Sequence, residues 1–219
     1  MPPPALLLFA KSPRPGRVKT RLCPPLPPAA AAALAAWMIR YTVDLARAHW
    51  PGPVSLWAWP DTRHPLWRAL EARGLPVLRQ GPGDLGEKMA AALAWGIRRQ
   101  GAAAVMGCDL PHCPPRVLRD AARALAGGRE VIGPAADGGY YLIGLTRARR
   151  GPFRGMPWGG RRLFPRTLGR LGAGGRRPRV LPVLRDLDRW EDVAALAARW
   201  PPLAEALARA GAPAPAAQD

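Results

Sequence analysis

The sequence predicts an α/β protein in which a mostly parallel central sheet carries helices on both faces. Short apolar segments of strand type alternate with helical patterns along most of the chain, as in sheets of this class. The 219 residues are enough for one domain with a sizeable core. We expect a single domain over residues 1–210 and a disordered tail at 211–219, where Ala and Pro alternate.

Seven short apolar runs are the expected strands. They lie at residues 5–10, 54–59, 77–78, 103–106, 131–133, 140–145 and 180–184.

Helical patterns lie between several of these strands. Pro28 opens an Ala-rich helix with its large apolar residues turned toward a core. Apolar residues recur every four positions from Leu85 to Ile97, which is one helix face, and Asp84 with Glu87 resembles a capping box at its start. Three further helices are expected, one opened by Pro114-Pro115 and the others at 162–171 and 190–199. Residues 147–178, rich in Gly and Arg, break the alternation and are expected to cover a sheet edge or the mouth of an active site.

The net charge of +18 is typical of nucleic-acid-binding proteins. Thirty of the thirty-three cations are Arg, scattered through a chain crowded with Ala, Pro and Gly, which indicates a compositional bias. A nucleic acid is therefore not the expected partner, and a small anionic substrate fits the charge equally well.

Cysteine content and hydropathy indicate which bonds, metal sites and cellular location to expect. Cys23, Cys108 and Cys113 cannot form a disulfide framework, and the spacing around His112 matches no common zinc site. No apolar run is expected to span a membrane, and the start does not resemble a secretory signal, so a cytoplasmic protein is expected. The sequence says nothing of the oligomeric state.

A loop of Gly, Pro and cations follows the first expected strand. Its cations are Lys11, Arg14, Arg17, Lys19 and Arg21. Such a loop at the carboxyl end of a strand is placed to hold phosphate oxygens through its side chains, since it lacks both the P-loop and the dinucleotide patterns. A solvated basic turn is the alternative.

Three Asp residues are the candidate metal ligands. Asp109 follows the strand at 103–106, next to Gly and Pro, and Asp186 and Asp188 follow the last strand. Carboxylates at this sheet edge suit Mg²⁺ or Mn²⁺. The alternatives are an Asx-turn at Asp109, a contact with an Arg at Asp186 and a cap of the following helix at Asp188.

Two glycine-containing motifs could line a substrate pocket. Asp137-Gly138-Gly139 is a strong turn signal, and its glycines would also let a flat ligand approach the backbone. Trp158 lies in the irregular segment and could be part of a lid or a buried anchor. The three histidines lie in unrelated contexts, so no Ser-His-Asp or Cys-His nucleophile is expected.

Six motifs in order make the chain resemble a bacterial family of nucleotide-diphospho-sugar transferase-like, glycosyltransferase A-type proteins. They are Phe9–Leu22, Gly83–Met89, Gly107–Pro111, Gly133–Gly144, Pro157–Gly159 and Asp186–Asp192. The resemblance runs from about residue 5 to 200. It extends, more faintly, to phospholactate and phosphoenolpyruvate guanylyltransferases.

The resemblance implies a Rossmann-like glycosyltransferase A fold that binds a nucleotide with Mg²⁺ or Mn²⁺. It implies metal ligands at Asp109, Asp186 and Asp188, with Lys19, Arg21 and Asp109 as catalytic residues. Phosphate or nucleotide contacts are expected at Lys11, Arg17, Lys19, Arg21, Glu87 and Lys88, and substrate contacts at Asp137, Gly138, Gly139 and Trp158. The chain departs from the family at Gly160 and Arg189, where Thr is usual, and at Leu110, where Cys is frequent.

Three function classes follow from these observations. The first is a metal-dependent transferase that passes the sugar of a nucleoside diphosphate sugar to an unknown acceptor. The second is a nucleotidyltransferase, which joins a nucleoside monophosphate to a phosphorylated acceptor. The third is a non-catalytic, basic polyanion-binding protein. The family label favours the first, and the basic loop also suits the second.

Overall fold

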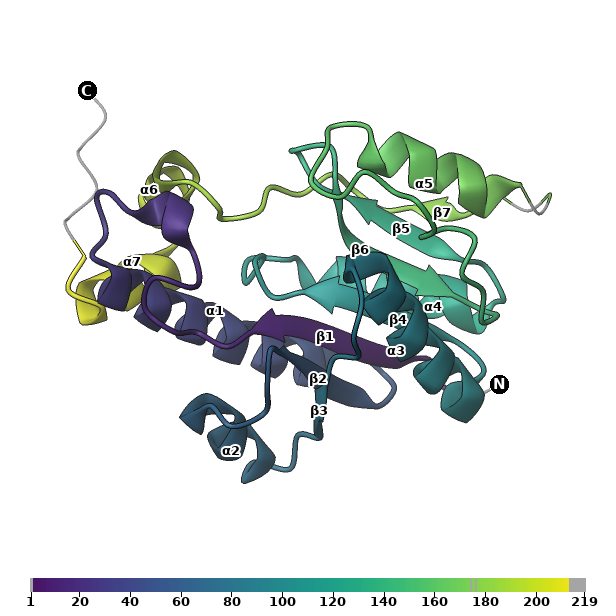
Figure 1. The fold of residues 1–219 in the computed structure, drawn as a ribbon, viewed down its shortest axis with the longest axis horizontal. Coiled ribbons are helices and arrows are strands. Elements are labelled where there is room, and N and C mark those ends of the chain that lie inside the picture. Colours follow the sequence, from purple (N-terminus) through teal and green to yellow (C-terminus); the bar gives the residue numbers. More distant parts are fainter. Residues whose placement is uncertain (1, 174, 176, 213–219) are drawn as a thin grey trace.

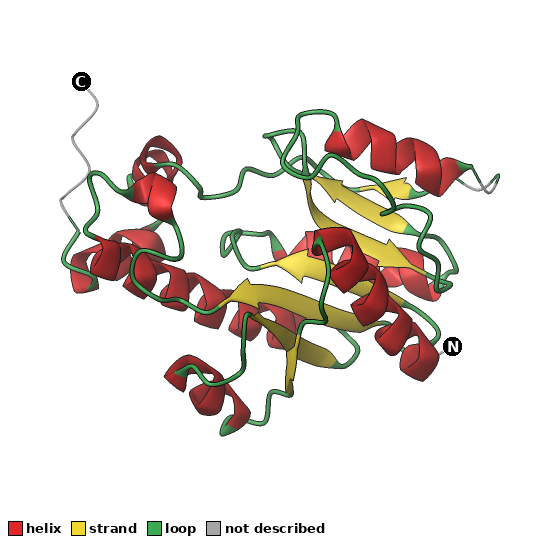
Figure 2. Ribbon diagram, viewed as in Figure 1, coloured by secondary structure: helices red, strands yellow, loops and turns green. Residues whose placement is uncertain are grey.

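The computed structural model describes residues 2–173, 175 and 177–212. It confirms the α/β fold, with helices on both faces of a central seven-stranded sheet (Figure 2). Most of the expected tail, 213–219, lies outside the described residues.

The sheet has the strand order β3-β2-β1-β4-β6-β5-β7. The strands are β1 (Ala5–Lys11), β2 (Val54–Trp59), β3 (Val77–Arg79), β4 (Ala103–Gly107), β5 (Val131–Pro134), β6 (Tyr140–Leu145) and β7 (Arg179–Val180). Pairing is parallel except at β6, which runs antiparallel to both β4 and β5. Because β6 alone is reversed, β1, β4, β5 and β7 end at the same sheet edge. This is the edge at which the sequence predicts the site.

The last strand is shorter than predicted. β7 ends at Val180, and an isolated bridge between Ala135 and Leu184 replaces the rest of the expected strand. Pro182 lies between Val180 and Leu184 and has no N–H to donate to a strand ladder, which explains why the expected strand is interrupted.

The helices are α1 (Pro28–His49), α2 (Pro65–Glu71), α3 (Leu85–Gln100), α4 (Pro115–Ala126), α5 (Leu163–Gly172), α6 (Trp190–Ala197) and α7 (Pro201–Arg209), with a 3-10 turn, η1 (Thr20–Leu22). The sequence does not predict α2, α7 or η1. α3 lies in front of the sheet in Figure 1, and α1 lies behind it.

Alternating residues of β1 show how the two faces are covered. Leu6 and Leu8 pack with residues of α1 and α4, whereas Leu7 packs with residues of α3. Side chains of successive strand residues point to opposite faces, so one strand contributes to two cores.

α1 meets the length and composition of a membrane-spanning helix, contrary to the expectation that no segment does. It has 22 residues, and 56% of its most apolar window is buried inside the protein. Its hydropathy is therefore accounted for by packing, since Leu34, Met38 and Val43 are all buried in the core.

A third core joins the C-terminal helices to the basic loop. Leu22 of η1 and Leu34 of α1 pack with Leu187, Val193 of α6 and Leu203 of α7. The connection from β7 to α6 crosses the end of the sheet to reach this core (Figure 1). It thereby places residues 186–188 against the loop that follows β1.

Candidate active site

Lys19 lies at the centre of the candidate site. Its Nζ is 2.8 Å from Oδ1 of Asp109 and 2.8 Å from Oδ1 of Asp188, and it donates to the carbonyl oxygen of Leu187 at 2.9 Å. The Lys19 side chain is only 7% exposed, whereas those of Asp109 and Asp188 are 49% and 39% exposed. Burial alone lowers the pKa of Lys19, but the two carboxylates outweigh it and raise the pKa above its ordinary value.

The backbone holds this cluster in place from three sides. Asp109 lies two residues after the end of β4, and its carbonyl accepts a hydrogen bond from Leu187 N at 3.1 Å. Lys19 precedes η1, where its carbonyl accepts from Leu22 N at 2.9 Å. Lys19 is also the one non-glycine residue in the described part of the chain with a positive φ, 47°. Such a backbone conformation is uncommon outside glycine and marks candidate functional positions.

Asp186 is the third carboxylate of the predicted set. Its pKa is raised to about 7, first by burial and then by the charges of Asp109, Asp188 and Asp137, against the opposing effect of Lys19. Its Oδ1 is buried and has no hydrogen-bond partner in the structure. The three predicted carboxylates therefore share one electrostatic environment, although only Asp109 and Asp188 contact Lys19.

The sequence alternative of Asp188 as a helix cap is wrong. The N-cap of α6 is Arg189, and no side chain caps this helix. Asp188 lies one position before the N-cap, and its Oδ1 instead accepts a hydrogen bond from the ammonium of Lys19. The other predicted cap is confirmed: Asp84 accepts from Glu87 N, and the Glu87 side chain accepts from Asp84 N, both at 2.9 Å.

Three of the other predicted phosphate-binding cations share a pocket with this cluster, and Lys88 does not. The pocket has a volume of about 320 Å³, and its lining includes Lys11, Arg17 and Arg21 besides Lys19, Asp109 and Asp188. Lys11, Arg17 and Arg21 are exposed. Two acids and four cations therefore meet where the sequence predicts phosphate and metal binding. Arg14 lies outside this lining and pairs with Asp61 at 3.2 Å.

The carboxylates of Asp109, Asp186 and Asp188 fit a divalent cation in chemistry, although they do not form a complete coordination shell. Among the described residues, no group of three or more His, Cys, Asp or Glu side chains converges as metal ligands. The position between Asp109 and Asp188 nevertheless already holds a cation, the Lys19 ammonium, and Asp186 has an unpartnered oxygen nearby. Hard carboxylate oxygens are the ligands that Mg²⁺ and Mn²⁺ prefer.

The residue types in the turn at Asp137–Gly139 are explained by the conformation and packing of the turn itself. Asp137 Oδ1 accepts from Gly139 N at 2.8 Å, which forms an Asx-turn. Gly138 has φ +93°, and a Cβ there would lie 2.4 Å from the backbone oxygen of Arg161. The space beside Gly138 is therefore filled by the protein itself. The turn still faces the site, because the charge of Asp137 contributes to the raised pKa of Asp186.

Trp158, Glu87 and Lys88 lie around the start of α3 and do not line the Lys19 pocket. The Trp158 indole Nε1 donates to Asp84 Oδ2 at 3.3 Å, and its ring leaves no room for a side chain at Gly86. The Lys88 ammonium stacks over the Trp59 ring, 3.4 Å from its centroid. Trp158 therefore anchors the irregular segment to α3, as one of its two sequence interpretations proposed.

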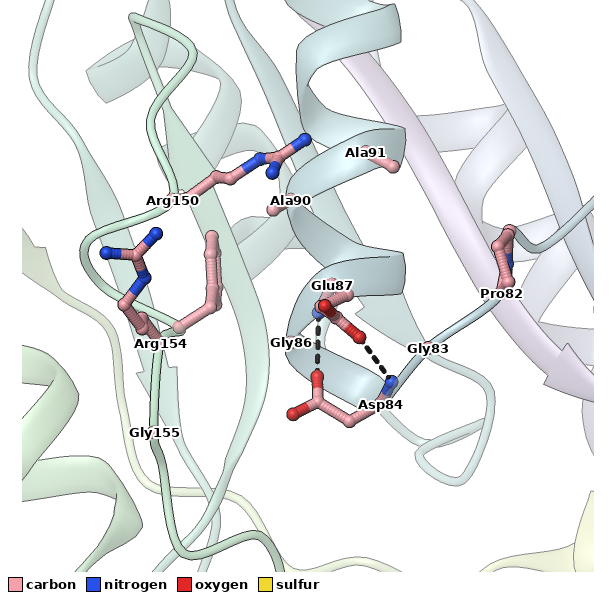
Figure 3. A pocket seen from close by; sticks show the side chains of 12 residues that line it. Pro82, Gly83, Asp84, Gly86, Glu87, Ala90, Ala91, Arg150, Arg154 and Gly155 are labelled. Carbon is pink, nitrogen blue, oxygen red and sulfur yellow. Dashed lines mark hydrogen bonds between the residues drawn. The ribbon is translucent and has the colours of Figure 1, made fainter.

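A larger cavity of about 550 Å³ lies along this part of α3. Figure 3 shows the Asp84–Glu87 capping box on one side of it and the side chains of Arg150 and Arg154 on the other. Phe153 also lines it, and no lining residue is shared with the Lys19 pocket. The sequence analysis named Glu87 and the segment 147–178 as candidates, and both line this cavity, but it did not predict a cavity between them. The smaller pocket is the candidate site, because Asp109, Asp188 and four of the predicted phosphate-binding cations converge there.

The cysteines and histidines take no part in the Lys19 cluster. Burial raises the pKa of the Cys113 thiol to about 12 and that of Cys108 further still. His112 packs edge-on against Trp200, with ring centroids 6.2 Å apart. His64 accepts from Leu66 N and caps α2.

Comparison with known proteins gives a family and a fold. The sequence profile of the family described as "Uncharacterized protein conserved in bacteria (DUF2064)" matches residues 42–160, which is just over half of the chain. No curated protein matches the sequence.

Three solved structures are similar to this one. A candidate nucleotide-diphospho-sugar transferase from Desulfovibrio desulfuricans G20 is 28% identical with a TM-score of 0.80, over 88% of this chain and 85% of that one. Rv0371c from Mycobacterium tuberculosis H37Rv, in complex with manganese, is 20% identical with a TM-score of 0.53, over 90% and 99% of the two chains. CMP:2-keto-3-deoxy-manno-octonic acid synthetase in complex with CTP is 14% identical with a TM-score of 0.55, also over 90% and 99%. The chain therefore has the fold of nucleotide-sugar transferases and nucleotidyltransferases.

Proposed function

We propose that this chain, which belongs to the DUF2064 family, is a metal-dependent transferase that passes the sugar of a nucleoside diphosphate sugar to an acceptor. The observation that carries the proposal is the Lys19 pocket, where the Asp109–Lys19–Asp188 cluster meets three further cations. A nucleoside diphosphate is anionic, and a hydrophobic or acidic pocket would not hold it. Similarity to the Desulfovibrio protein supports the same class of substrate.

The basic residues of the pocket have the charge needed to bind the diphosphate. Lys11, Arg17 and Arg21 line the pocket and can donate charge-assisted hydrogen bonds to the diphosphate oxygens. Glycosyl transfer breaks the bond between the sugar and a phosphate oxygen, which leaves negative charge on the nucleoside diphosphate. Fixed cations around that oxygen stabilise the transition state because no solvent has to reorganise as the charge develops.

Asp109 and Asp188 would hold a divalent cation, with Asp186 beside them. When bound, Mg²⁺ or Mn²⁺ supplies charge stabilisation to the diphosphate leaving group. The manganese complex of Rv0371c is a property of a distant relative, and it supports the choice of metal only through the shared fold.

A second candidate function is nucleotidyl transfer. The observation that favours it is the number of cations in one small pocket: Lys11, Arg17, Lys19 and Arg21 suit an attack on the α-phosphate of a nucleoside triphosphate. A synthetase with the same fold has been solved in complex with CTP, and this supports the candidate only through the shared fold.

One experiment separates these functions. The purified protein is incubated with labelled nucleoside triphosphates and, separately, with nucleotide sugars, in the presence of millimolar Mg²⁺ or Mn²⁺ or of excess chelator. Release of nucleoside diphosphate from a nucleotide sugar supports glycosyl transfer, and release of pyrophosphate supports nucleotidyl transfer. If no nucleotide binds while random duplex DNA binds tightly at physiological salt, the basic polyanion-binding protein becomes the better interpretation.

A further inference from the structure

Lys19 occupies a position built like a cation site. Its ammonium lies among three oxygens, from Asp109, Leu187 and Asp188, at 2.8–2.9 Å. Two carboxylates and a carbonyl form the kind of hard oxygen set that a divalent cation selects. The lysine side chain is nearly buried, while both carboxylates are open to solvent. The carboxylates can therefore be reached by a cation from outside while the ammonium fills the position between them.

We propose that Lys19 is an internal competitor for the divalent metal. Its ammonium holds the position between Asp109 and Asp188 until phosphate groups draw it away, so that metal and nucleotide favour each other's binding. This inference rests on the proposed function, because it takes Asp109 and Asp188 as the metal ligands.

Electrostatics is the physical reason for competition. An ammonium and a divalent cation a few ångströms apart repel each other, so both cannot share the same pair of oxygens. The lysine side chain can move because it is a flexible four-carbon stem. Its backbone need not move, since the Lys19 carbonyl is fixed by Leu22 N at 2.9 Å. A released ammonium needs an anion, and the same pocket is lined by the cations that would hold one.

A direct alternative is metal binding without competition. Oδ1 of each carboxylate contacts Lys19, and the second oxygen of each is not part of this contact. A metal bound by those second oxygens would leave the ammonium in place. The two arrangements differ in what removal of the Lys19 charge does to metal affinity.

The first test is a titration with Mn²⁺ alone, followed by calorimetry, on wild type, Lys19→Met and Arg14→Met. Lys19→Met keeps the length of the side chain and removes its charge. Arg14→Met removes one charge from the same loop outside the pocket, where Arg14 pairs with Asp61. We expect Lys19→Met to bind Mn²⁺ about 5- to 150-fold more tightly than wild type, the usual range of such coupling, and Arg14→Met to match wild type.

The second test uses wild-type protein and does not depend on a variant's folding. The chain has three lysines, Lys11, Lys19 and Lys88, so lysine labelled at the terminal carbon or nitrogen gives three NMR signals. Addition of diamagnetic Mg²⁺ should move the Lys19 signal toward that of a solvated ammonium. The Lys88 signal is the internal control, because its ammonium lies over the Trp59 ring and Lys88 does not line the pocket.

The outcomes separate the inference from the function on which it rests. Equal Mn²⁺ affinity of wild type and Lys19→Met, with an unmoved Lys19 signal, overturns the competition and leaves the metal site standing. If no protein binds Mn²⁺ and no lysine signal responds to Mg²⁺, the proposed metal site itself is wrong, and the inference fails with it. Should Lys19→Met not fold, the wild-type signals decide alone.

Discussion

The ammonium of Lys19 lies 2.8 Å from Oδ1 of Asp188, and 169 positions separate the two residues. This contact ties the loop after β1 to the segment before α6. Leu22 and Leu187, close in sequence to the two residues of this contact, both pack in the core formed with α1, α6 and α7. Residues near the two ends of the chain therefore set the geometry of one pocket. Substitutions near either end should change the same nucleotide- and metal-binding measurements.

Asp109→Asn should remove the metal dependence of nucleotide binding. The amide keeps the shape of the side chain and loses the charge that attracts a divalent cation. We expect nucleotide affinity in wild type to rise on adding millimolar Mg²⁺ or Mn²⁺, and to be the same with metal and with excess chelator in the variant. Isothermal calorimetry measures both.

Asp120→Asn is the matched control for this prediction. Asp120 lies on α4 and pairs with Arg123 at the protein surface, at 3.4 Å. It should keep the wild-type response to metal. Identical nucleotide affinities of wild type in metal and in chelator would show that the three carboxylates do not bind a cation for the substrate.

Replacing Arg17 and Arg21 by Ala should weaken nucleotide binding and leave stability almost unchanged. Each lost charged hydrogen bond should cost about 1.5–3 kcal/mol of binding free energy. Both side chains are exposed, so thermal unfolding should shift little. Arg98→Ala, an exposed cation near the far end of α3, controls for the general loss of positive charge. A double variant with undiminished nucleotide affinity would show the loop to be a solvated turn.

The parts of the site that follow from local pattern were predictable from the sequence. The strand at Ala5–Lys11, the basic loop after it and Asp109 at the end of β4 each depend on neighbouring residues alone. The Asp84–Glu87 capping box is of the same kind, since it joins positions three apart. The common edge of the parallel strands then brings Asp109 near Asp186 and Asp188, as predicted.

The rest depends on contacts that no local pattern encodes. Burial of Lys19 between Asp109 and Asp188 requires the core of α6 and α7, and the sequence analysis did not predict α7. The space beside Gly138 is filled by the Arg161 backbone, which comes from the irregular segment. The antiparallel β6 is different, because it follows from the local turn at Asp137–Gly139, which the sequence analysis identified without deriving the direction of β6 from it.

Gly138→Ala should destabilise the fold whether or not a ligand contacts this turn. Its φ of +93° is strained for any side chain, and the added Cβ would lie 2.4 Å from the Arg161 carbonyl oxygen. We expect the free energy of unfolding to fall by more than about 1 kcal/mol. Chemical denaturation followed by circular dichroism measures the change.

Gly169→Ala is the control within the same part of the molecule. Gly169 lies in α5, where nothing is within 4 Å of an added Cβ and no positive φ is found. The same substitution there should raise stability by about 0.5–1 kcal/mol, because Ala loses less conformational freedom than Gly in a helix. A Gly138→Ala protein as stable as wild type but without nucleotide binding would instead make the turn part of the ligand pocket.

The last prediction concerns the dependence of stability on pH. Burial lowers the pKa of His112, and the charge of Arg199 lowers it further. His112 is therefore neutral in the fold at pH values where an unfolded chain already binds a proton. Below about pH 6.5, the ordinary value, protonation favours the unfolded state, so the contribution of His112 to stability is lost as the pH falls through this value toward the lowered pKa. His112→Gln has no such proton to bind. Between pH 7.5 and pH 5, it should lose less unfolding free energy than wild type. Urea denaturation of both proteins at the two pH values measures the difference. His49→Gln, at the end of α1, controls for the general effect of removing a histidine. If wild type and His112→Gln lose the same stability over this interval, His112 is not held neutral by its surroundings.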